Sequence, residues 1–357
     1  MKRLIIGNLI SKWHLYGFEA YLKNINKLDD YHIIIFIQYH QASKSYRIHE
    51  EDFNFLDLNN TSIKVEYVNK LEKQTTFLKN ILRSYDVNRD SIIMISAHQM
   101  NIYQLFAIKR YRNVQYVLID EGMGSYYSKS LWKLETQTLG KSRTTPFDFI
   151  KNNLKRIIQH KYCNNLIDNC LLIKNDNSWV INKKSVNNYI SYFNSCIKKI
   201  KINCLNNSDV IFVSDNISLM LKNKEDEIYI YQCLYQWIIK KFNTRRIWFK
   251  PHPNEKSDLN KISELKSIGF SILNDNYSFE NITHSYNLIV LGLGSTSLLT
   301  TSLIFKKISY SLFNLIDNDF LNEYGISKKK EFFCITKDIK NLIIEDKREG
   351  GGNENKN

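Results

Sequence analysis

Short runs rich in isoleucine and valine alternate with helix-like segments along most of this chain, and this alternation constrains its fold more than any other feature. In the first part, the strand-like runs are residues 3–7, 32–38, 62–68, 91–97 and 115–120. Helical patterns lie between them, for example over residues 17–27 and 75–84. Strands that alternate with helices favour a mostly parallel sheet with helices on both faces.

The alternation stops in the middle of the chain and then resumes. Residues 128–205 are rich in Lys, Asn and Ser, and strand-like runs return from residue 208. We therefore expect an α/β protein with two Rossmann-like domains that face each other across a cleft. The expected parts are an N-terminal domain over 1–180 with a basic helical insertion near 128–205, a C-terminal domain over 206–342, and a disordered tail over 343–357.

Length and composition agree with a folded protein of two domains. The chain has 357 residues, of which 43% are hydrophobic, and this excludes the class of disordered proteins. No apolar run reaches the roughly eighteen residues of a membrane-spanning helix, and the start of the chain lacks the apolar core of a secretory signal. The six cysteines form no CxxC pair, so we expect reduced thiols in a cytoplasmic protein.

The chain is strongly basic, with a formal net charge of +14 at pH 7. Such a charge favours polyanions, anionic membranes or acidic substrates as partners. The sequence has neither zinc-finger spacing nor an RNA-binding sheet signature, so no nucleic-acid partner is expected. Within residues 146–162, Phe147, Ile150 and Leu154 recur at helical spacing among basic residues. This segment is either a helix that lies on an anionic membrane or an ordinary surface helix packed on its own domain.

Polar motifs follow three of the strand-like runs, and the first motif is acidic. The run 116–119 leads into Asp120, Glu121 and Gly122, with a second glycine at position 124. Glycines favour a tight turn that can expose a carboxylate, and an exposed carboxylate can act as a general base. The alternative is an acidic turn that caps the next segment.

The second motif presents a single imidazole. His252 lies between Pro251 and Pro253, two of the chain's three prolines, directly after a strand-like run that ends near Lys250. Proline fixes φ and restricts the residue before it, so the imidazole is held stiffly. The imidazole can donate a hydrogen bond to a phosphate, and Lys250 would strengthen such an anion site. The alternative is a strand end followed by a simple turn.

The third motif combines glycines with hydroxyl side chains. The run 288–291 meets Gly292 and Gly294, and residues 295–297 follow as Ser-Thr-Ser at the expected start of a helix. Backbone N–H groups and hydroxyls at such a point bind anions, whereas the alternative is a serine that only caps the helix. The motif is neither a Walker loop nor a GxGxxG fingerprint.

In this order, and each at a strand end, the three motifs resemble those of the bacterial sialyltransferases that share a (D/E)(D/E)G motif, an HP motif and a later Ser-Ser/Thr motif. Asp120-Glu121-Gly122 matches the first motif, His252-Pro253 the second and Ser295-Thr296 the third. The chain most resembles glycosyltransferase family 52, the lipooligosaccharide and polysaccharide sialyltransferases, and the bacterial polysialyltransferases are a second relative. Residues 128–205 match no part of that pattern, so the resemblance leaves the acceptor open.

The resemblance implies a GT-B architecture, in which the C-terminal domain holds CMP-sialic acid and the N-terminal domain supplies the catalytic carboxylate and the acceptor site. It implies an inverting transfer, in which an acceptor hydroxyl attacks C2 of the sialyl residue and CMP leaves. Asp120 would be the general base with Glu121 beside it, and His252, Ser295 and Thr296 would stabilise the leaving phosphate. No metal or other cofactor is required, and the Asp-Asn-Asp run at 317–319 reads as a loop.

The remaining expected site residues follow from the rule that ligands bind outside the carboxyl ends of parallel strands. The expected donor-binding residues are Gly122, Lys250, Pro253, Gly294, Ser295, Thr296, Ser297 and Ser214, with Asn216 close to the last. The expected acceptor-binding residues are Asn8, His14, His98 and Gln99, with Ser11 between the first two. The resemblance also implies a glycan or lipid-linked oligosaccharide acceptor, with a terminal galactose hydroxyl as the expected group, and peripheral attachment to the inner face of the cytoplasmic membrane.

Three other readings stay open. The same fold could use another cytidine-activated donor, CMP-Kdo or CDP-glycerol, because Lys-x-His-Pro runs also occur in glycerophosphate transferases. The chain could be a polysialyltransferase that adds many residues. It could also be a basic protein without enzymatic activity that docks to a membrane or to nucleic acid, although that reading explains neither the acid-glycine turn nor the His-Pro run.

Overall fold

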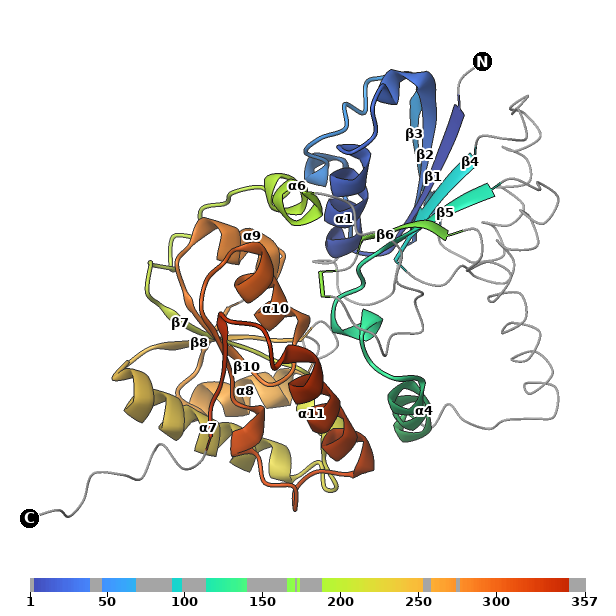
Figure 1. The fold of residues 1–357 in the computed structure, drawn as a ribbon. Coiled ribbons are helices and arrows are strands. Elements are labelled where there is room, and N and C mark those ends of the chain that lie inside the picture. The colour runs from blue at the N-terminus through green and yellow to red at the C-terminus, as the bar shows by residue number, and fades with distance from the viewer. Residues whose placement is uncertain are drawn as a thin grey trace, which may run out of the picture. The chain divides into compact units, whose positions relative to one another are not determined.

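The computed structural model describes residues 3–38, 47–68, 92–97, 114–139, 166–170, 172–173, 188–252, 258–273 and 277–346. The chain divides into two compact units, of which the first takes residues 1–121 and 143–198 and the second takes residues 122–142 and 199–357. Each unit is built around a parallel sheet with helices (Figure 1). The predicted α/β class is therefore confirmed.

The sheet of the first unit has six strands among the described residues. They are β1 (Arg3–Leu9), β2 (Tyr31–Gln38), β3 (Ile63–Val68), β4 (Ile92–Ser96), β5 (Val114–Ile119) and β6 (Leu166–Cys170). They lie in the order β3-β2-β1-β4-β5-β6, and every pairing is parallel. In chain order this is 3-2-1-4-5-6, the Rossmann arrangement, in which ligands bind at the point where the strand order reverses.

Helix α1 (Lys12–Leu22) packs directly on this sheet. A Cβ on Gly7 of β1 would lie 2.6 Å from the ring of Phe18, so only glycine allows the helix to approach this closely. Helix α6 (Tyr189–Ser195) packs on α1, and the ring of Phe193 contacts those of Trp13 and Tyr16. The short turns η1 (Leu28–Asp30) and η3 (Glu50–Asp52) complete the described part of this unit.

The second unit repeats the same sheet arrangement. Its strands are β7 (Val210–Val213), β8 (Ile247–Lys250), β9 (Ser271–Ile272), β10 (Ile289–Gly292), β11 (Ser309–Ser311) and β12 (Leu342–Ile344). They lie in the order β12-β11-β10-β7-β8-β9, again with parallel pairings. The order reverses between β7 and β10, so the residues that follow these two strands flank the expected ligand crevice.

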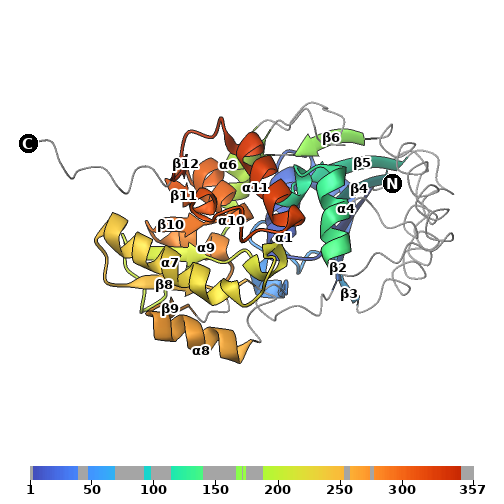
Figure 2. The same ribbon diagram turned by 90° about the horizontal axis from the view of Figure 1, so that it is seen from below.

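The described helices of the second unit include a segment from the first half of the chain. The helices and turns are η4 (Met123–Ser125), α4 (Lys129–Thr138), η5 (Ile217–Met220), α7 (Asp226–Phe242), α8 (Leu259–Ile268), α9 (Phe279–Ser285), α10 (Thr296–Leu299), the π-helical η6 (Thr300–Ile304), η7 (Phe313–Leu315) and α11 (Glu323–Thr336). Figure 2 shows α4 beside α11. Buried aromatic rings join helix to sheet, because Tyr231 of α7 meets Phe212 and Phe249 edge-on.

The strands expected over 3–7, 32–38, 62–68, 91–97 and 115–120 correspond to β1 to β5 within a few residues. The helix expected over 17–27 begins earlier, at Lys12, because the Ser11 side chain accepts the His14 N–H and so starts α1 there. The helices expected over 75–84 and 146–162 lie outside the described residues. No described helix is both long and apolar enough to cross a bilayer.

The structure divides the chain differently from the expected domain boundaries. The polar region 128–205 is not one insertion, since α4 belongs to the second unit while β6 pairs with β5 in the first. Ile343 and Ile344, expected in the tail, pair with β11, and the described chain continues to residue 346. The cleft expected between two facing domains stays a prediction.

Candidate functional site

Three neighbouring strands of the second unit end at one edge of its sheet. β7 lies between β8 and β10, and the register aligns Val213 with both Lys250 and Gly292. The Ser214 N–H donates to the Lys250 carbonyl oxygen at 3.1 Å, so the two strand ends stay joined beyond the sheet. The predicted His-Pro and Gly-Ser-Thr motifs therefore leave the same edge, on either side of β7.

The glycine loop after β10 is held by hydrogen bonds from two neighbouring strand ends. The Asp215 carboxylate accepts the Gly294 N–H, and the buried Ser311 hydroxyl donates to the Leu293 carbonyl oxygen. Ser295 caps α10, because its hydroxyl oxygen accepts the Ser297 N–H at 3.2 Å. Ser295 and Thr296 are half-buried, whereas Ser297 is buried. The loop is thus fixed in place, and two of its three hydroxyl residues reach the surface.

The acid-glycine turn meets this loop. The boundary between the two units falls inside the motif, between Glu121 and Gly122. Within the second unit, the Met123 N–H donates to the Thr296 hydroxyl oxygen at 3.0 Å. Gly122 and Thr296, both predicted as donor-binding residues, are therefore neighbours although 174 positions separate them in the sequence.

His252 and Lys250 differ in exposure although only Pro251 separates them. Lys250 is buried, and its ammonium group donates to the Tyr277 carbonyl oxygen at 3.4 Å. Pro251 is also buried, and His252 is half-exposed just beyond it. His252 follows the end of β8, where the sequence predicted a strand end, and its rigid presentation stays a prediction because Pro253 lies outside the described residues.

The residues that follow β7 have different roles, which could not be distinguished from the sequence. The Ser214 hydroxyl is buried and shares a 3.0 Å hydrogen bond with the Tyr231 hydroxyl, so this side chain contributes to the core. Asn216 has a left-handed backbone, and its side chain accepts from the Ser218 hydroxyl at 2.9 Å. Asp215, which holds the glycine loop, was missed, although its place at the end of the first strand of this unit was a signal.

In the first unit, the two acidic residues of the turn differ sharply in burial. Asp120 is 0% exposed, and its carboxylate accepts the Leu172 N–H at 3.2 Å. Its carbonyl oxygen accepts the Trp13 indole N–H at 2.8 Å, which fixes the end of β5. Glu121 is half-exposed. Burial raises the pKa of the Tyr189 hydroxyl well above its usual value, and the nearby Cys170 and Asp120 add to this shift.

The expected acceptor residues are only partly described. Asn8 of β1 and His14 of α1 are both buried, and the His14 ring nitrogen Nδ1 accepts the Ile10 N–H at 3.3 Å. This bond gives His14 a local role in shaping the turn between β1 and α1. His98 and Gln99 lie outside the described residues.

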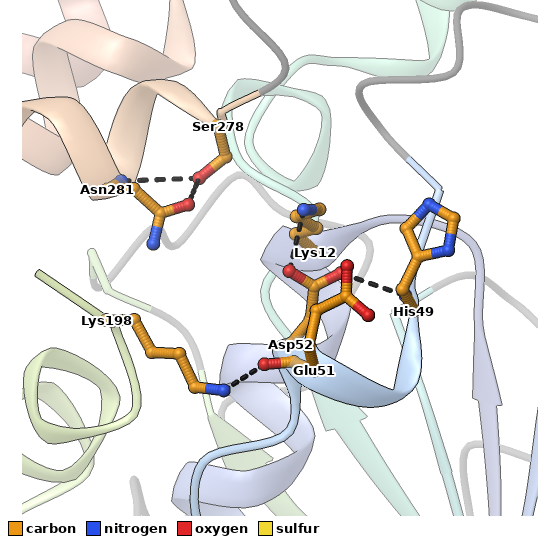
Figure 3. A network of polar contacts seen from close by, with 7 residues as sticks. All are labelled: Lys12, His49, Glu51, Asp52, Lys198, Ser278 and Asn281. Atoms are coloured by element: carbon orange, nitrogen blue, oxygen red, sulfur yellow. Dashed lines mark hydrogen bonds and ion pairs between the residues drawn. The ribbon is translucent and has the colours of Figure 1, made fainter. Parts of the chain in front are cut away.

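A buried ion pair in the first unit was missed by sequence reasoning. Lys12, at the start of α1, pairs with Asp52 at 2.6 Å, and both side chains are largely buried (Figure 3). Asp52 also accepts the His49 N–H at 2.9 Å, and the Lys198 ammonium group donates to the Glu51 carbonyl oxygen. Lys12 could have been noticed in the sequence, because it is a charged residue in the first turn after β1. Ligands of this fold bind beyond the carboxyl ends of such strands.

Figure 3 also draws a polar pair in the second unit, where the Ser278 hydroxyl donates to the Asn281 side-chain oxygen at 2.7 Å at the start of α9. No group of three or more His, Cys, Asp or Glu side chains in the described part of the chain is arranged to hold a metal ion. In the Asp-Asn-Asp loop at 317–319, the Asn318 side-chain oxygen accepts from Lys329 at 3.2 Å.

Comparisons with known proteins identify the family and the fold of the chain. The family described as alpha-2,8-polysialyltransferase (POLYST) matches residues 5–314. No protein of curated function matches the chain. Among solved structures, the GT-B domain of a sialyltransferase from Photobacterium damselae is similar with a TM-score of 0.51 and 12% identity, over 95% of this chain and 99% of that one.

A second similar structure is a UDP-GlcNAc 2-epimerase from Methanocaldococcus jannaschii, with a TM-score of 0.53 and 13% identity, over 97% of this chain and 89% of that one. Identities this low bear on the fold alone, and the fold they indicate is GT-B. The predicted likeness to bacterial sialyltransferases is confirmed by the family match, which falls on the second of the two expected relatives. The chain belongs to the alpha-2,8-polysialyltransferase family and has the GT-B fold.

Proposed function

We propose that this protein transfers sialic acid from CMP-sialic acid to a hydroxyl group of a bacterial surface glycan, with inversion at the anomeric carbon. Membership of the family supports a sialyl donor. The observation that carries the proposal is the convergence of Lys250-Pro251-His252 and Gly294-Ser295-Thr296 at one edge of the second sheet. Imidazole, hydroxyl and backbone N–H donors at a strand edge suit the phosphate of a nucleotide donor.

The acceptor hydroxyl needs a base to take its proton as it attacks C2 of the sialyl residue. The sequence expectation assigns this role to Asp120, whose buried carboxylate accepts the Leu172 N–H. The exposure of the two side chains favours Glu121, because a base must come within hydrogen-bonding reach of the acceptor. Asp120→Asn and Glu121→Gln, each assayed for CMP release and for CMP binding, assign the base to the variant that loses turnover but still binds CMP.

The bond between C2 and the CMP phosphate breaks as the acceptor oxygen attacks, and negative charge grows on the departing phosphate. The sequence expectation gives His252, Ser295 and Thr296 as donors to that charge, and all three side chains are only partly buried. Removing one such donor typically costs about 3 kcal/mol of transition-state stabilisation. The scheme needs no metal, so turnover that stops on addition of EDTA and returns with a divalent cation would contradict this part of the proposal.

The acceptor is proposed from the family description, which names an α-2,8 polysialyl product. A glycan that ends in sialic acid is therefore the proposed acceptor, and a galactose-terminated glycan is the alternative. Mass spectrometry of the products from both acceptors with CMP-sialic acid separates them. Products that carry several added residues on the sialylated acceptor support the proposal, and no product from either acceptor refutes it.

The donor can be tested without an acceptor. CMP-sialic acid, CMP-Kdo and CDP-glycerol should each be compared with CMP in a thermal-shift experiment, because only the true donor stabilises the protein beyond CMP alone. Stabilisation by CDP-glycerol or CMP-Kdo, but not by CMP-sialic acid, would move the protein to another donor class.

The same proposal makes this a peripheral protein of the inner face of the cytoplasmic membrane. A net charge of +14 supports attraction to anionic lipids, to which each nearby basic residue contributes roughly 1 kcal/mol. Vesicle flotation at low salt, with anionic and with neutral lipid, tests this. Equal binding to both lipids, or binding to neither, would contradict it.

A further inference from the structure

Thr296 makes two contacts with the acid-glycine turn rather than lying open beside it. Its hydroxyl oxygen accepts the Met123 N–H at 3.0 Å. Its methyl and hydroxyl groups also lie against Gly122, since a Cβ built on that glycine would be 2.4 Å from each of them. Both contacts lie within the second unit, so one side chain binds the turn to the loop that follows β10.

Gly122 cannot be replaced without disturbing this contact. Its φ of +87° is rarely adopted by residues with side chains, and the Thr296 side chain occupies the space that a Cβ would need. The turn therefore combines a backbone conformation and a close approach that both require glycine. Thr296, the second residue of the Ser-Thr motif, therefore restricts position 122, the third residue of the acidic motif, to glycine.

The chain that follows the turn is anchored to the same unit. Met123 and Tyr126 are buried, and at Ser128 both the N–H, at 2.7 Å, and the hydroxyl group donate to the Glu331 carboxylate of α11. Residues 122–128 are thus held at one end by Thr296 and at the other by Glu331. The residue that precedes Gly122 in the chain is Glu121, so the anchored segment begins directly after the acidic pair.

We propose that Thr296 is a positioning residue, which fixes Gly122 and Met123 against the donor loop, and that Ser295 and His252 are the donors to the CMP phosphate. The inference deepens the proposed function and rests on it for the identity of the donor. Its physical basis is that the hydroxyl oxygen of Thr296 satisfies a backbone N–H, which would otherwise lose its partner.

Two conservative substitutions of Thr296 distinguish a positioning role from a role in phosphate binding. Thr296→Val keeps the shape but removes the hydroxyl acceptor, and Thr296→Ser keeps the acceptor but removes the methyl group. We expect Thr296→Val to lower kcat about tenfold or more, as the loss of one buried hydrogen bond allows, while the Kd for CMP stays within about twofold of the parent. Thr296→Ser should keep both values within about threefold of the parent.

Two measurements test these expectations. Calorimetry gives the Kd for CMP, and turnover is expressed per CMP-binding site, which corrects for unfolded protein.

A tenfold weaker affinity for CMP in Thr296→Val, restored in Thr296→Ser, would show that the hydroxyl binds phosphate and would overturn the inference. An unchanged kcat per binding site would overturn it as well, because the contact would then matter only for folding. A parent protein that releases no CMP from CMP-sialic acid refutes the proposed function, and a separate measurement then still tests the contact.

That measurement is a thermal-unfolding cycle that needs no substrate. Gly122→Ala should lower the Tm strongly, and Thr296→Ala should lower it less. The double variant should be more stable than the sum of the two losses predicts, because Thr296→Ala removes the two groups that would clash with the new Cβ. The backbone strain of alanine at position 122 is the same in the parent and in Thr296→Ala, so it cancels in the comparison. Simple addition of the two Tm changes would mean that the contact does not exist.

Discussion

Glu19 shows how one side chain in α1 holds a distant loop. Its carboxylate accepts the N–H groups of Asn54, Phe55 and Leu56, at distances of 2.9–3.3 Å. The side chain is fully buried, and burial raises its pKa despite these hydrogen bonds and the nearby Lys23. The carboxylate thus acts as an acceptor for three backbone groups at a cost in desolvation.

The raised pKa of Glu19 predicts how stability changes with pH. The folded state holds the proton more tightly than the unfolded state, so this residue favours folding most below its unfolded pKa and loses that contribution as pH rises through the folded pKa. Glu19→Gln should keep an oxygen acceptor and remove this pH dependence. Glu19→Ala should cost about 3 kcal/mol at pH 7, because three N–H groups lose their partner. Urea unfolding between pH 4 and pH 8 measures the stability of both variants and its dependence on pH. An equal loss of stability in Glu19→Gln and Glu19→Ala would contradict the role of Glu19 as a hydrogen-bond acceptor.

The cysteines provide a second prediction at this scale. Cys170 and Cys196 are buried and form no disulfide, and burial raises the pKa of Cys196 to about 12. Cys204, Cys233 and Cys334 are exposed. Because the thiolate is the reactive form, iodoacetamide at neutral pH should modify the three exposed thiols and spare the two buried ones. Site-resolved mass spectrometry reads this out, and denatured protein is the control in which all should react.

At the scale of elements, one carboxylate of α11 binds the residue that caps α4. Glu331 accepts both the N–H and the hydroxyl of Ser128, the residue that caps α4. The buried Tyr127 hydroxyl has no hydrogen-bond partner among the described residues, and burial raises its pKa well above the usual value, with a further contribution from Asp215. The α4 segment is therefore bound at its start, next to the loop residues of the candidate site.

Glu331→Ala should release the start of α4. We expect faster hydrogen exchange over residues 129–138 and a loss of roughly 1–3 kcal/mol in stability, because two donors lose a charged acceptor. Glu323→Ala is the matched control, since Glu323 lies on the same helix and is exposed. Equal exchange in the two variants would mean that α4 is held by its apolar contacts alone.

The elements show which features could be predicted from sequence. The strands β1 to β5 were found because each is a compact apolar run bounded by polar turns. The assignment of α4 to the second unit could not be found, because it depends on Glu331, about two hundred positions away. Asp215 and Lys12 were missed for a similar reason, since the partner that gives each its role, Gly294 or Asp52, is distant in sequence. The contact of Gly122 and Met123 with Thr296 was predicted in part, because Gly122 and Thr296 were both expected to bind the donor.

At the scale of the whole molecule, two sheets with the same strand order carry different parts of the predicted site. The His-Pro and Gly-Ser-Thr motifs belong to the second unit, and Asp120 and Glu121 end the first of the two stretches of chain that form the first unit. If the donor is held by the second unit, CMP alone should slow hydrogen exchange over residues 210–216 and 289–297, while residues 31–38 in the first sheet keep their rates. Protection confined to the first sheet would contradict the donor assignment.

The division of the chain between its two units also sets where this protein can be cut and rejoined. The second unit is built from two separate stretches of chain, 122–142 and 199–357, which are tied together by the Met123–Thr296 and Ser128–Glu331 hydrogen bonds. A chimera with a relative that exchanges only the C-terminal stretch would pair a foreign loop with the native turn. A chimera that takes both stretches from one parent keeps these contacts and needs a junction between Glu121 and Gly122, in the middle of the acidic motif.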